Sequence, residues 1–158
     1  VLSLLDEQGN VLATTGSNIA DLSVVPAGGK IPFLAMLDKD PQPYAKVEIL
    51  VQGEPFTGSS IFPPYFDLKI DKVTGQESNF GRYSLSGKVI NTGTKPAELV
   101  KIVAIAYDEN GKVIDVGWTF SKLDTILPGQ ESPFALDFTT IEKAPAKYEI
   151  FTEGDEGK

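Results

Sequence analysis

Apolar and polar side chains alternate along short stretches of the chain, and turn residues separate these stretches. In YFDLKIDKV (65–73) and AKVEILV (45–51) the alternation has a period of two, which is the pattern of a strand with one buried face. Gly, Pro, Asn and Asp mark the breaks, and no stretch keeps a helical period. The pattern therefore predicts an all-β fold, an antiparallel β-sandwich of the immunoglobulin or fibronectin type.

The chain after residue 64 has the strand number and spacing of a complete sandwich. The expected strands are 65–73, 83–90, 98–107, 112–119, 123–127, 132–138 and 146–152. Two apolar stretches that contain a Pro near their start, IPFLAML (31–37) and SPFALDF (132–138), are expected to be short strands. The charged tail EGDEGK (153–158) is expected to be frayed.

One phrase occurs twice in the chain. LLDEQGNV (4–11) returns as AYDENGKV (106–113), and the shared Asp, Glu, Gly and Val lie 102 positions apart. Further along, AKVEI (45–49) matches AKYEI (146–150) at an offset of 101. An offset that changes by a single residue over such a length indicates a duplicated unit whose copies differ by one loop residue.

The duplication predicts two copies, 1–54 and 103–155, that superpose strand for strand. The first copy lacks the strands that come before residue 103 in the second. We therefore expect an incomplete sandwich repeat at 1–54, a Pro- and Gly-rich linker at 55–64, and a complete sandwich repeat at 65–158.

The incomplete copy is expected to need a covering partner. Its predicted inward-facing side chains are Leu2, Leu4, Phe33, Val47 and Ile49. A half sandwich of this size cannot support a core alone. Strands of another chain, an upstream segment of the same protein, or the second copy could cover it, and the first two are favoured because the second copy has its own strands. The expected partner is thus another protein, or a second chain of this one by self-association, that completes the first repeat.

A series of short motifs follows in a fixed order within the second copy. They are Gly87-x-Val89-x-Asn91-x-Gly93, then Tyr107–Asp108, then Gly111–Lys112–Val113, then Leu127–Pro128–Gly129 with Phe134. In this order they resemble the FxLYD-type immunoglobulin-like domains of bacterial and archaeal surface proteins. LSLLD (2–6) fits that pattern except that Leu5 replaces the usual Tyr, and Ala104 stands where the second copy should carry Phe. The resemblance implies an immunoglobulin-like sandwich and brings no catalytic residues.

Composition narrows the possible chemistry. The net charge is −8, and the chain contains neither His nor Cys. Negative charge disfavours nucleic acid and anionic membrane surfaces as partners. Without His and Cys there is no Ser–His or Cys–His pair and no soft ligand for structural zinc. No apolar run has the length of a membrane span. We expect a protein that is not an enzyme and has no cofactor or metal, and we interpret the chain as part of a longer exported protein, extracellular or on the cell surface.

The turn residues of the repeated phrases are candidate sites with a structural interpretation. Asp at the start of such a turn binds backbone amides, and Gly supplies a positive φ. The residues concerned are Asp6, Gly9, Asp108, Gly111, Asn91 and Gly93. A calcium loop would need further oxygen ligands at alternate positions and a final Glu, and the phrases lack them, so we expect a structural role.

Two aromatic residues and a set of carboxylates are the remaining candidates. Trp118 and Phe120 could form a platform for a sugar or peptide, although packing of Trp118 in the core is favoured. Paired carboxylates could perform glycosidase-like chemistry, but a solvated acidic surface is favoured for them. These carboxylates are Asp67, Asp71, Asp108, Asp115 and Asp124.

Three functions are compatible with the sequence. The first is a non-catalytic extracellular module that acts as a spacer, adhesion or assembly unit. The second is a carbohydrate- or peptide-binding module that uses Trp118 and Phe120. The third is an accessory domain of a larger secreted enzyme. The first is expected because the chain combines repeated strand-rich units, acidity and a lack of catalytic residue types.

Overall fold

The computed structural model describes residues 1–16, 22–25, 27–38, 43–58, 60–77 and 81–157. In these residues the regular elements are all β-strands, so the all-β prediction is confirmed. This part of the chain contains no helix of the length and apolar character needed to cross a membrane. The chain divides into two compact units: a first unit of Val1–Asp21 and Phe33–Thr57, and a second unit of Leu22–Pro32 and Gly58–Lys158.

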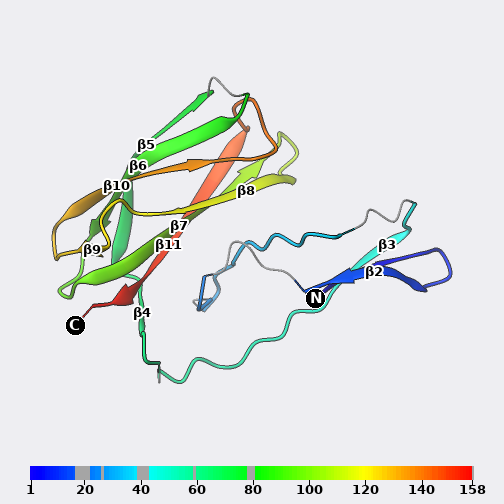
Figure 1. The fold of residues 1–158 in the computed structure, drawn as a ribbon, viewed down its shortest axis with the longest axis horizontal. Coiled ribbons are helices and arrows are strands. Elements are labelled where there is room, and N and C mark those ends of the chain that lie inside the picture. The colour runs from blue at the N-terminus through cyan, green and yellow to red at the C-terminus, as the bar shows by residue number, and fades with distance from the viewer. Residues whose placement is uncertain (17–21, 26, 39–42, 59, 78–80, 158) are drawn as a thin grey trace. The chain divides into compact units, whose positions relative to one another are not determined.

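The second unit is an antiparallel β-sandwich (Figure 1). Its strands are β4 (Pro64–Tyr65), β5 (Leu68–Glu77), β6 (Tyr83–Asn91), β7 (Ala97–Tyr107), β8 (Val113–Phe120), β9 (Thr125–Ile126), β10 (Glu131–Asp137) and β11 (Lys147–Glu156). One sheet has the order β10-β6-β5, and the other has the order β4-β11-β7-β8 with β9 paired to β7. The chain crosses between the sheets from β4 to β5, from β6 to β7, from β9 to β10 and from β10 to β11, as strands do in a sandwich.

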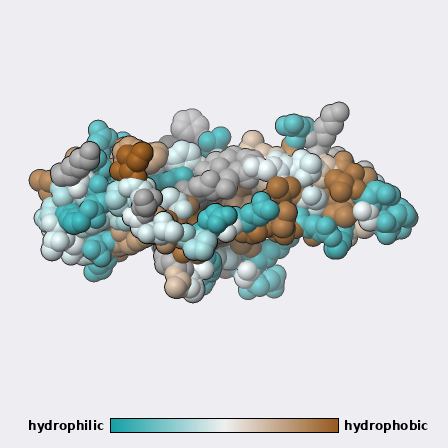
Figure 2. All heavy atoms as spheres, turned by 90° about the horizontal axis from the view of Figure 1, so that it is seen from below, coloured by the Kyte–Doolittle hydropathy of each residue, from teal (hydrophilic) through white to brown (hydrophobic). Residues whose placement is uncertain are grey.

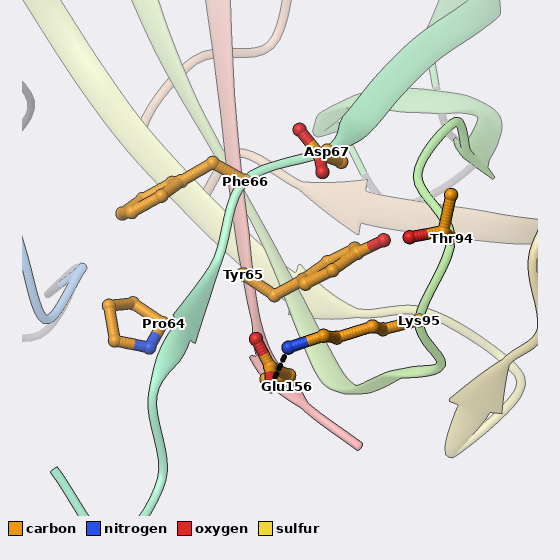
Figure 3. Close-up of a pocket in the computed structure, with 7 residues that line it drawn as sticks. All are labelled: Pro64, Tyr65, Phe66, Asp67, Thr94, Lys95 and Glu156. Carbon is orange, nitrogen blue, oxygen red and sulfur yellow. Dashed lines mark hydrogen bonds and ion pairs between the residues drawn. The ribbon is translucent and has the colours of Figure 1, made fainter. Parts of the chain in front are cut away.

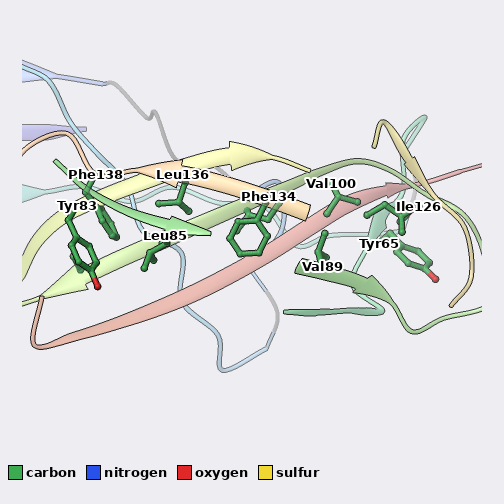
Figure 4. Close-up of a cluster of buried hydrophobic side chains, with 13 residues drawn as sticks. Tyr65, Tyr83, Leu85, Val89, Val100, Ile126, Phe134, Leu136 and Phe138 are labelled. Atoms are coloured by element: carbon green, nitrogen blue, oxygen red, sulfur yellow. The ribbon is translucent and has the colours of Figure 1, made fainter. Parts of the chain in front are cut away.

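One apolar core lies between these two sheets (Figure 4). The alternation is clearest in β10, where Ser132, Phe134 and Leu136 are buried and the residues between them are exposed. The other large core side chains are Tyr65, Tyr83, Leu85, Val89, Val100, Ile102, Ile126 and Phe138. Each such side chain contributes about 1.5–3 kcal/mol when fully buried, so the period-two pattern is what holds this unit together.

The strand positions predicted for 65–158 are confirmed to within a few residues, with two differences. The first expected strand is divided into β4 and β5. The tail is not frayed through most of its length, because β11 continues to Glu156, where Asp155 pairs with Glu98 and Glu156 with Ala97. The prediction of a frayed tail was wrong because the polar tail residues continue the ladder with β7 beyond the apolar part of the strand.

The first unit contains a three-stranded antiparallel sheet. Its strands are β1 (Leu2–Leu5), β2 (Val11–Thr15) and β3 (Lys46–Ile49), in the order β2-β1-β3. The expected strand at 31–37 is absent: the residues there have no regular structure. The predicted counterpart of this segment, β10, is a strand that pairs with β6, and the described residues of the first unit include no strand equivalent to β6. The prediction failed because a strand needs a neighbour for its backbone hydrogen bonds.

The sheet of the first unit has the same local geometry as β8-β7-β11 of the second. The pairs Leu2↔Thr15 and Leu2↔Ile49 correspond to Ala104↔Gly117 and Ala104↔Ile150 at the offsets found in the sequence. Both hairpins also have a register shift at the same place, between Leu4 and Leu5 and between Ala106 and Tyr107. This agreement covers three strands of each copy. A tandem repeat of sandwiches, with the domain boundaries given above, stays a prediction.

The segment Leu22–Pro32 groups with the second unit although the sequence assigns it to the first copy.

Candidate functional site

The turn after β7 is held by one carboxylate. Asp108 Oδ1 accepts hydrogen bonds from the backbone N–H of Asn110 at 2.9 Å and of Lys112 at 2.8 Å. Gly111 has φ of 77°, in the left-handed region that favours glycine. Asp108 therefore fixes the turn, as predicted for this residue.

The turn after β1 repeats this arrangement. Asp6 Oδ1 accepts from the N–H of Gln8 at 2.9 Å and of Asn10 at 2.8 Å, and Gly9 has φ of 84°. The amide side chain of Asn10 also donates to Asp6 Oδ2, and this bond, followed by the backbone bonds, lowers the pKa of the carboxyl group. The carboxylate oxygens are thus directed at the protein's own turn.

Asn91 connects three segments of the second unit from a fully buried position. Its Oδ1 accepts from the Tyr65 hydroxyl at 2.9 Å and from the N–H of Gly93 at 3.0 Å, while its Nδ2 donates to the carbonyls of Lys95 at 2.7 Å and Ile126 at 2.8 Å. A Cβ on Gly93 would lie 2.1 Å from the Tyr65 hydroxyl oxygen, so a side chain there would displace Tyr65. Asn91 and Gly93 therefore have a structural role.

Trp118 lies on the outer face of the sandwich, and its predicted packing in the core was wrong. It is 41% exposed, and Phe120, two residues along the same face of β8, is 49% exposed. The two rings meet edge to face with centroids 5.8 Å apart, and the Lys101 ammonium lies 5.0 Å from the Trp118 ring centroid. The structure brings together three side chains that can stack on a ligand or carry a cation–π contact.

One of the five candidate carboxylates is not on a solvated surface. Asp115 is buried, and its two oxygens accept hydrogen bonds from the N–H of Val116 and of Thr140, each at 2.7 Å. It ties β8 to the segment after β10, which explains its burial. Among the described residues, no three His, Cys, Asp or Glu side chains gather where they could hold a metal ion.

A hollow of about 340 Å³ opens beside β4 in the second unit (Figure 3). It is lined by Pro64, Tyr65, Phe66, Asp67, Thr94, Lys95 and Glu156. Its lysine and glutamate pair with each other, and the tyrosine hydroxyl is bound to Asn91. On neighbouring β11, the pKa of Asp155 is raised by burial and then by the charges of Glu153 and Glu98. Three polar side chains of the hollow, those of Tyr65, Lys95 and Glu156, are therefore engaged with the protein itself.

The segment Leu22–Pro32 is bound to β11 through two glutamates that the sequence did not single out. Glu153, a buried residue, accepts hydrogen bonds from the N–H of Ser23 at 2.9 and 3.1 Å, from the Ser23 hydroxyl, and from the N–H of Val24 at 3.3 Å. One carboxylate thus binds the start of the segment through backbone and side chain together.

The other end of this segment is held by charge. Lys30 forms an ion pair with Glu149 and lies 3.4 Å from the Tyr107 hydroxyl. Glu149 also accepts from Lys147 at 2.6 Å and from the Tyr107 hydroxyl at 3.1 Å. The bond from Lys147, and then that from Lys30, lowers the pKa of Glu149 from 4.5 to about 2. No local motif marks the contacts of the segment, since Ser23 lies 130 positions from Glu153 and Lys30 lies 77 positions from Tyr107.

The first unit displays apolar side chains whose counterparts in the second unit are covered. Phe33 is 42% exposed, whereas its counterpart Phe134 is 3% exposed. Val47 and Ile49 are 44% and 53% exposed, while their counterparts pack against the sandwich core. We refer to Phe33, Val47 and Ile49 as the exposed trio. Of the other predicted inward residues, Leu4 is buried and Leu2 is half-buried.

Hydrophobic groups are visible among the polar ones on the face drawn in Figure 2. Large hydrophobic side chains exposed in the first unit also include Val11, Leu12, Met36, Leu50 and Val51. Exposed apolar patches on a small sheet are typical of surfaces that bind another protein. The exposed trio is therefore the candidate site of this unit, and Trp118 with Phe120 is that of the second.

These features define an all-β protein with one antiparallel sandwich and a separate three-stranded sheet. Comparison with protein-family models, curated proteins and solved structures found no match to the chain. The resemblance to FxLYD-type domains accordingly stays a prediction.

Proposed function

We propose that the chain is a non-catalytic β-sandwich module that serves as an assembly, adhesion or spacer unit of a secreted or cell-surface protein. The observation that carries the proposal is the contrast between matched positions. The residue pairing of β2-β1-β3 equals that of β8-β7-β11, yet the exposed trio is open to solvent where its counterparts are covered. A three-stranded sheet with exposed apolar side chains gains stability when another protein covers them.

The chemistry of the candidate polar residues supports a role without catalysis. Asp6, Asp108, Asn91 and Asp115 each direct their oxygens at backbone N–H groups or at neighbouring side chains. Their geometry is that of groups which fix loops. The net charge of −8 agrees with a soluble surface module whose partner is a protein.

Sedimentation of the purified chain tests the assembly role. We expect association that rises with chain concentration and is lost in a Val47→Ser/Ile49→Ser double variant. Val51→Ser is the matched control, because it removes an exposed apolar side chain outside β3, and it should associate like the unchanged chain. A chain that stays monomeric at every concentration and unfolds in one cooperative step would contradict the proposal.

The exposure of Trp118 and Phe120 favours a second candidate function, the binding of carbohydrate or peptide. A glycan array probed with the unchanged chain and with the Trp118→Ala variant separates ligand binding from the assembly role. Binding that Trp118→Ala abolishes, while the association of the chain is unchanged, would assign this function to the second unit. A blank array would leave the aromatic pair as a surface feature only.

A further inference from the structure

Asn110 is followed directly by a glycine, and this is true of no other asparagine in the sequence. Asparagine is a thermolabile residue, and it is most reactive before glycine. The backbone nitrogen of a glycine can attack the side-chain amide carbon of the preceding residue because no Cβ hinders the approach. Asn110 and Gly111 lie in the turn between β7 and β8, and both are exposed.

The other asparagines that the structure describes are protected from this reaction. Asn10 donates its side-chain amide to Asp6 at 2.9 Å, and Asn91 is fully buried with its amide bound to two carbonyls. Each is followed by a β-branched residue, Val11 or Thr92, whose side chain crowds the backbone nitrogen. Asn110 thus differs from both in the exposure of its side chain and in its neighbour.

We propose that Asn110 is a self-modification site, which converts to isoaspartate and aspartate at a rate that the Asp108 turn restrains. The backbone nitrogen of Gly111 forms a bond to the side-chain amide carbon of Asn110. The carbon–nitrogen bond of that amide breaks, and ammonia leaves with the proton of the Gly111 N–H. Water then opens the cyclic imide, at the side-chain carbonyl to give aspartate or at the main-chain carbonyl to give isoaspartate.

Both products change the turn. Each places a new carboxylate beside Asp108 and Glu109, so that like charges lie close together. In isoaspartate the main chain also runs through the side-chain carbon and is longer by one atom. The hydrogen bonds from the N–H groups of Gly111 and Lys112 to Asp108 depend on the normal spacing of the backbone. The reaction therefore adds negative charge and loosens the turn without any enzyme.

The folded turn slows the reaction by holding the attacking nitrogen. A backbone nitrogen attacks after it has lost its proton, and the N–H of Gly111 donates that proton to the Asp108 carbonyl at 3.0 Å. The Asp108 carboxylate fixes the same turn through the N–H groups of Asn110 and Lys112. Removal of this carboxylate should therefore speed the conversion of Asn110.

The turn after β1 is an internal control in the same molecule. Asp6 accepts from the N–H of Gln8 as Asp108 accepts from that of Asn110, and Gly9 has φ of 84°, in the same region as the glycine of the second turn. The longer glutamine side chain must close a larger and less favourable ring. Two turns of the same backbone geometry thus differ by one methylene group at the reacting residue.

Peptide mapping of the folded chain tests the proposal. The chain is kept in mildly alkaline buffer, and samples are digested with trypsin and sequenced by mass spectrometry. We expect replacement of the amide by a carboxyl group at Asn110 at least ten times faster than at Gln8. Labelling by an isoaspartyl methyltransferase should show that most of the product is isoaspartate. The proposal is overturned if Asn110 is unchanged when the synthetic peptide AYDENGKV, residues 106–113, has reacted fully.

Chain variants test the site and its restraint. Asn110→Gln should abolish the conversion, and Gln8→Asn should make the first turn reactive. Asp108→Ala should raise the rate at Asn110 at least threefold, whereas Asp108→Asn, which keeps an acceptor oxygen, should raise it less. Glu109→Ala is the matched control and should leave the rate unchanged. Fluorescence of Trp118 confirms that each variant is folded during the incubation. A rate that Asp108→Ala does not alter removes the restraint from the proposal, and a first turn that stays unreactive in Gln8→Asn contradicts the role given to the Asn–Gly pair.

Discussion

Individual polar side chains determine the loop geometry of both units. The same Asp–x–x–Gly turn, with the carboxylate accepting two backbone N–H groups, follows β1 and β7. In the second unit the buried side chains of Asn91 and Asp115 also hold loops in place through hydrogen bonds. A backbone group that loses its partner in such a place costs free energy, and this makes the contribution of each side chain measurable.

Replacing Asp108 by Ala should destabilise the second unit. The N–H groups of Asn110 and Lys112 lose their acceptor, and we expect the free energy of unfolding to fall by about 0.5–2 kcal/mol, by analogy with lost caps. Urea unfolding followed by the fluorescence of Trp118 measures it, since this is the only tryptophan. Glu109→Ala, which removes the neighbouring exposed carboxylate, is the control and should change stability little. Full stability of Asp108→Ala together with loss of a binding activity would show that the residue serves a ligand.

Replacing Asn91 by Ala should cost more than removing the hydroxyl that it binds. Asn91→Ala leaves the Tyr65 hydroxyl and two carbonyls without their buried partner, and we expect a loss of about 1–3 kcal/mol. Tyr65→Phe removes one of these bonds and should cost less. Thermal unfolding of both variants and of the double variant gives the coupling between the two residues. Equal and additive losses would mean that the hydrogen bond observed here contributes nothing.

The structural role of Asp108 could be predicted because its partners Asn110 and Lys112 lie close in sequence. For Asn91 only the bonds to Gly93 and Lys95 are local, and those to Tyr65 and Ile126 come from distant segments.

The orientation of Trp118 could not be predicted. In β7 both faces are apolar, and Val103 and Ile105, which lie outside the core cluster, are buried as well. Alternation alone therefore does not say which face of β8 turns toward the second sheet. Which face is inside depends on packing between sheets, which no local pattern contains.

At the scale of elements, β11 combines two roles. One face belongs to the sandwich core through Tyr148 and Ile150. The alternate residues Glu149 and Glu153 bind the segment Leu22–Pro32. A strand that is apolar on one side and carries spaced carboxylates on the other can hold both a sheet and a crossing segment.

The contribution of Glu149 to the stability of the second unit should depend on pH. Its pKa in the folded chain is about 2 instead of 4.5, owing first to Lys147 and then to Lys30, with the Tyr107 hydroxyl as a further donor. A lowered pKa stabilises the folded state above about pH 4.5, and this stabilisation is lost as the pH falls toward 2. The stability difference between the unchanged chain and Glu149→Gln should therefore shrink over this range, and salt should reduce it because the pairs are exposed.

Urea unfolding at pH 6 and pH 3, monitored by Trp118 fluorescence, gives this difference. The matched control is Glu48→Gln, since Glu48 pairs with Lys46 in the first unit as Glu149 pairs with Lys147 in the second. It should not alter the transition that Trp118 reports. A difference for Glu149→Gln that is the same at both pH values would contradict the assignment.

The strand predicted at 31–37 is absent from the structure, which shows what a prediction from the local pattern lacks. Its apolar positions match those of β10, so the local pattern is correct. Strand structure in β10 is completed by β6, more than forty residues earlier in the chain. The apolar–polar alternation indicates which side chains of a strand can be buried. The neighbouring strand that buries them comes from elsewhere in the chain or from a partner.

For the whole molecule, the sequence predicted a sandwich in the second part of the chain and an incomplete repeat in the first, and the domain boundaries stay a prediction. The strand spacing of 65–158 predicted the sandwich, and the offsets of 102 and 101 reappear as equal residue pairings in the two sheets. The assignment of Leu22–Pro32 to the second unit was not foreseen. This assignment depends on Glu153 and Glu149. In the sequence pattern nothing distinguishes these two glutamates from other acidic residues expected at the surface.

The division into units predicts that residues 58–158 fold alone, because every residue of the core cluster lies between Tyr65 and Ile150. We expect this fragment to unfold cooperatively, with Trp118 as the reporter, and to be less stable than the full chain because Ser23 and Val24 no longer bind Glu153. Glu153→Ala should lower the stability of the second unit in the full chain by about 1–3 kcal/mol. The same change should cost clearly less in the fragment, where the carboxylate has lost these partners. Equal losses in the full chain and in the fragment would mean that Glu153 stabilises β11 itself. A fragment without a cooperative transition would mean that the sandwich needs the rest of the chain.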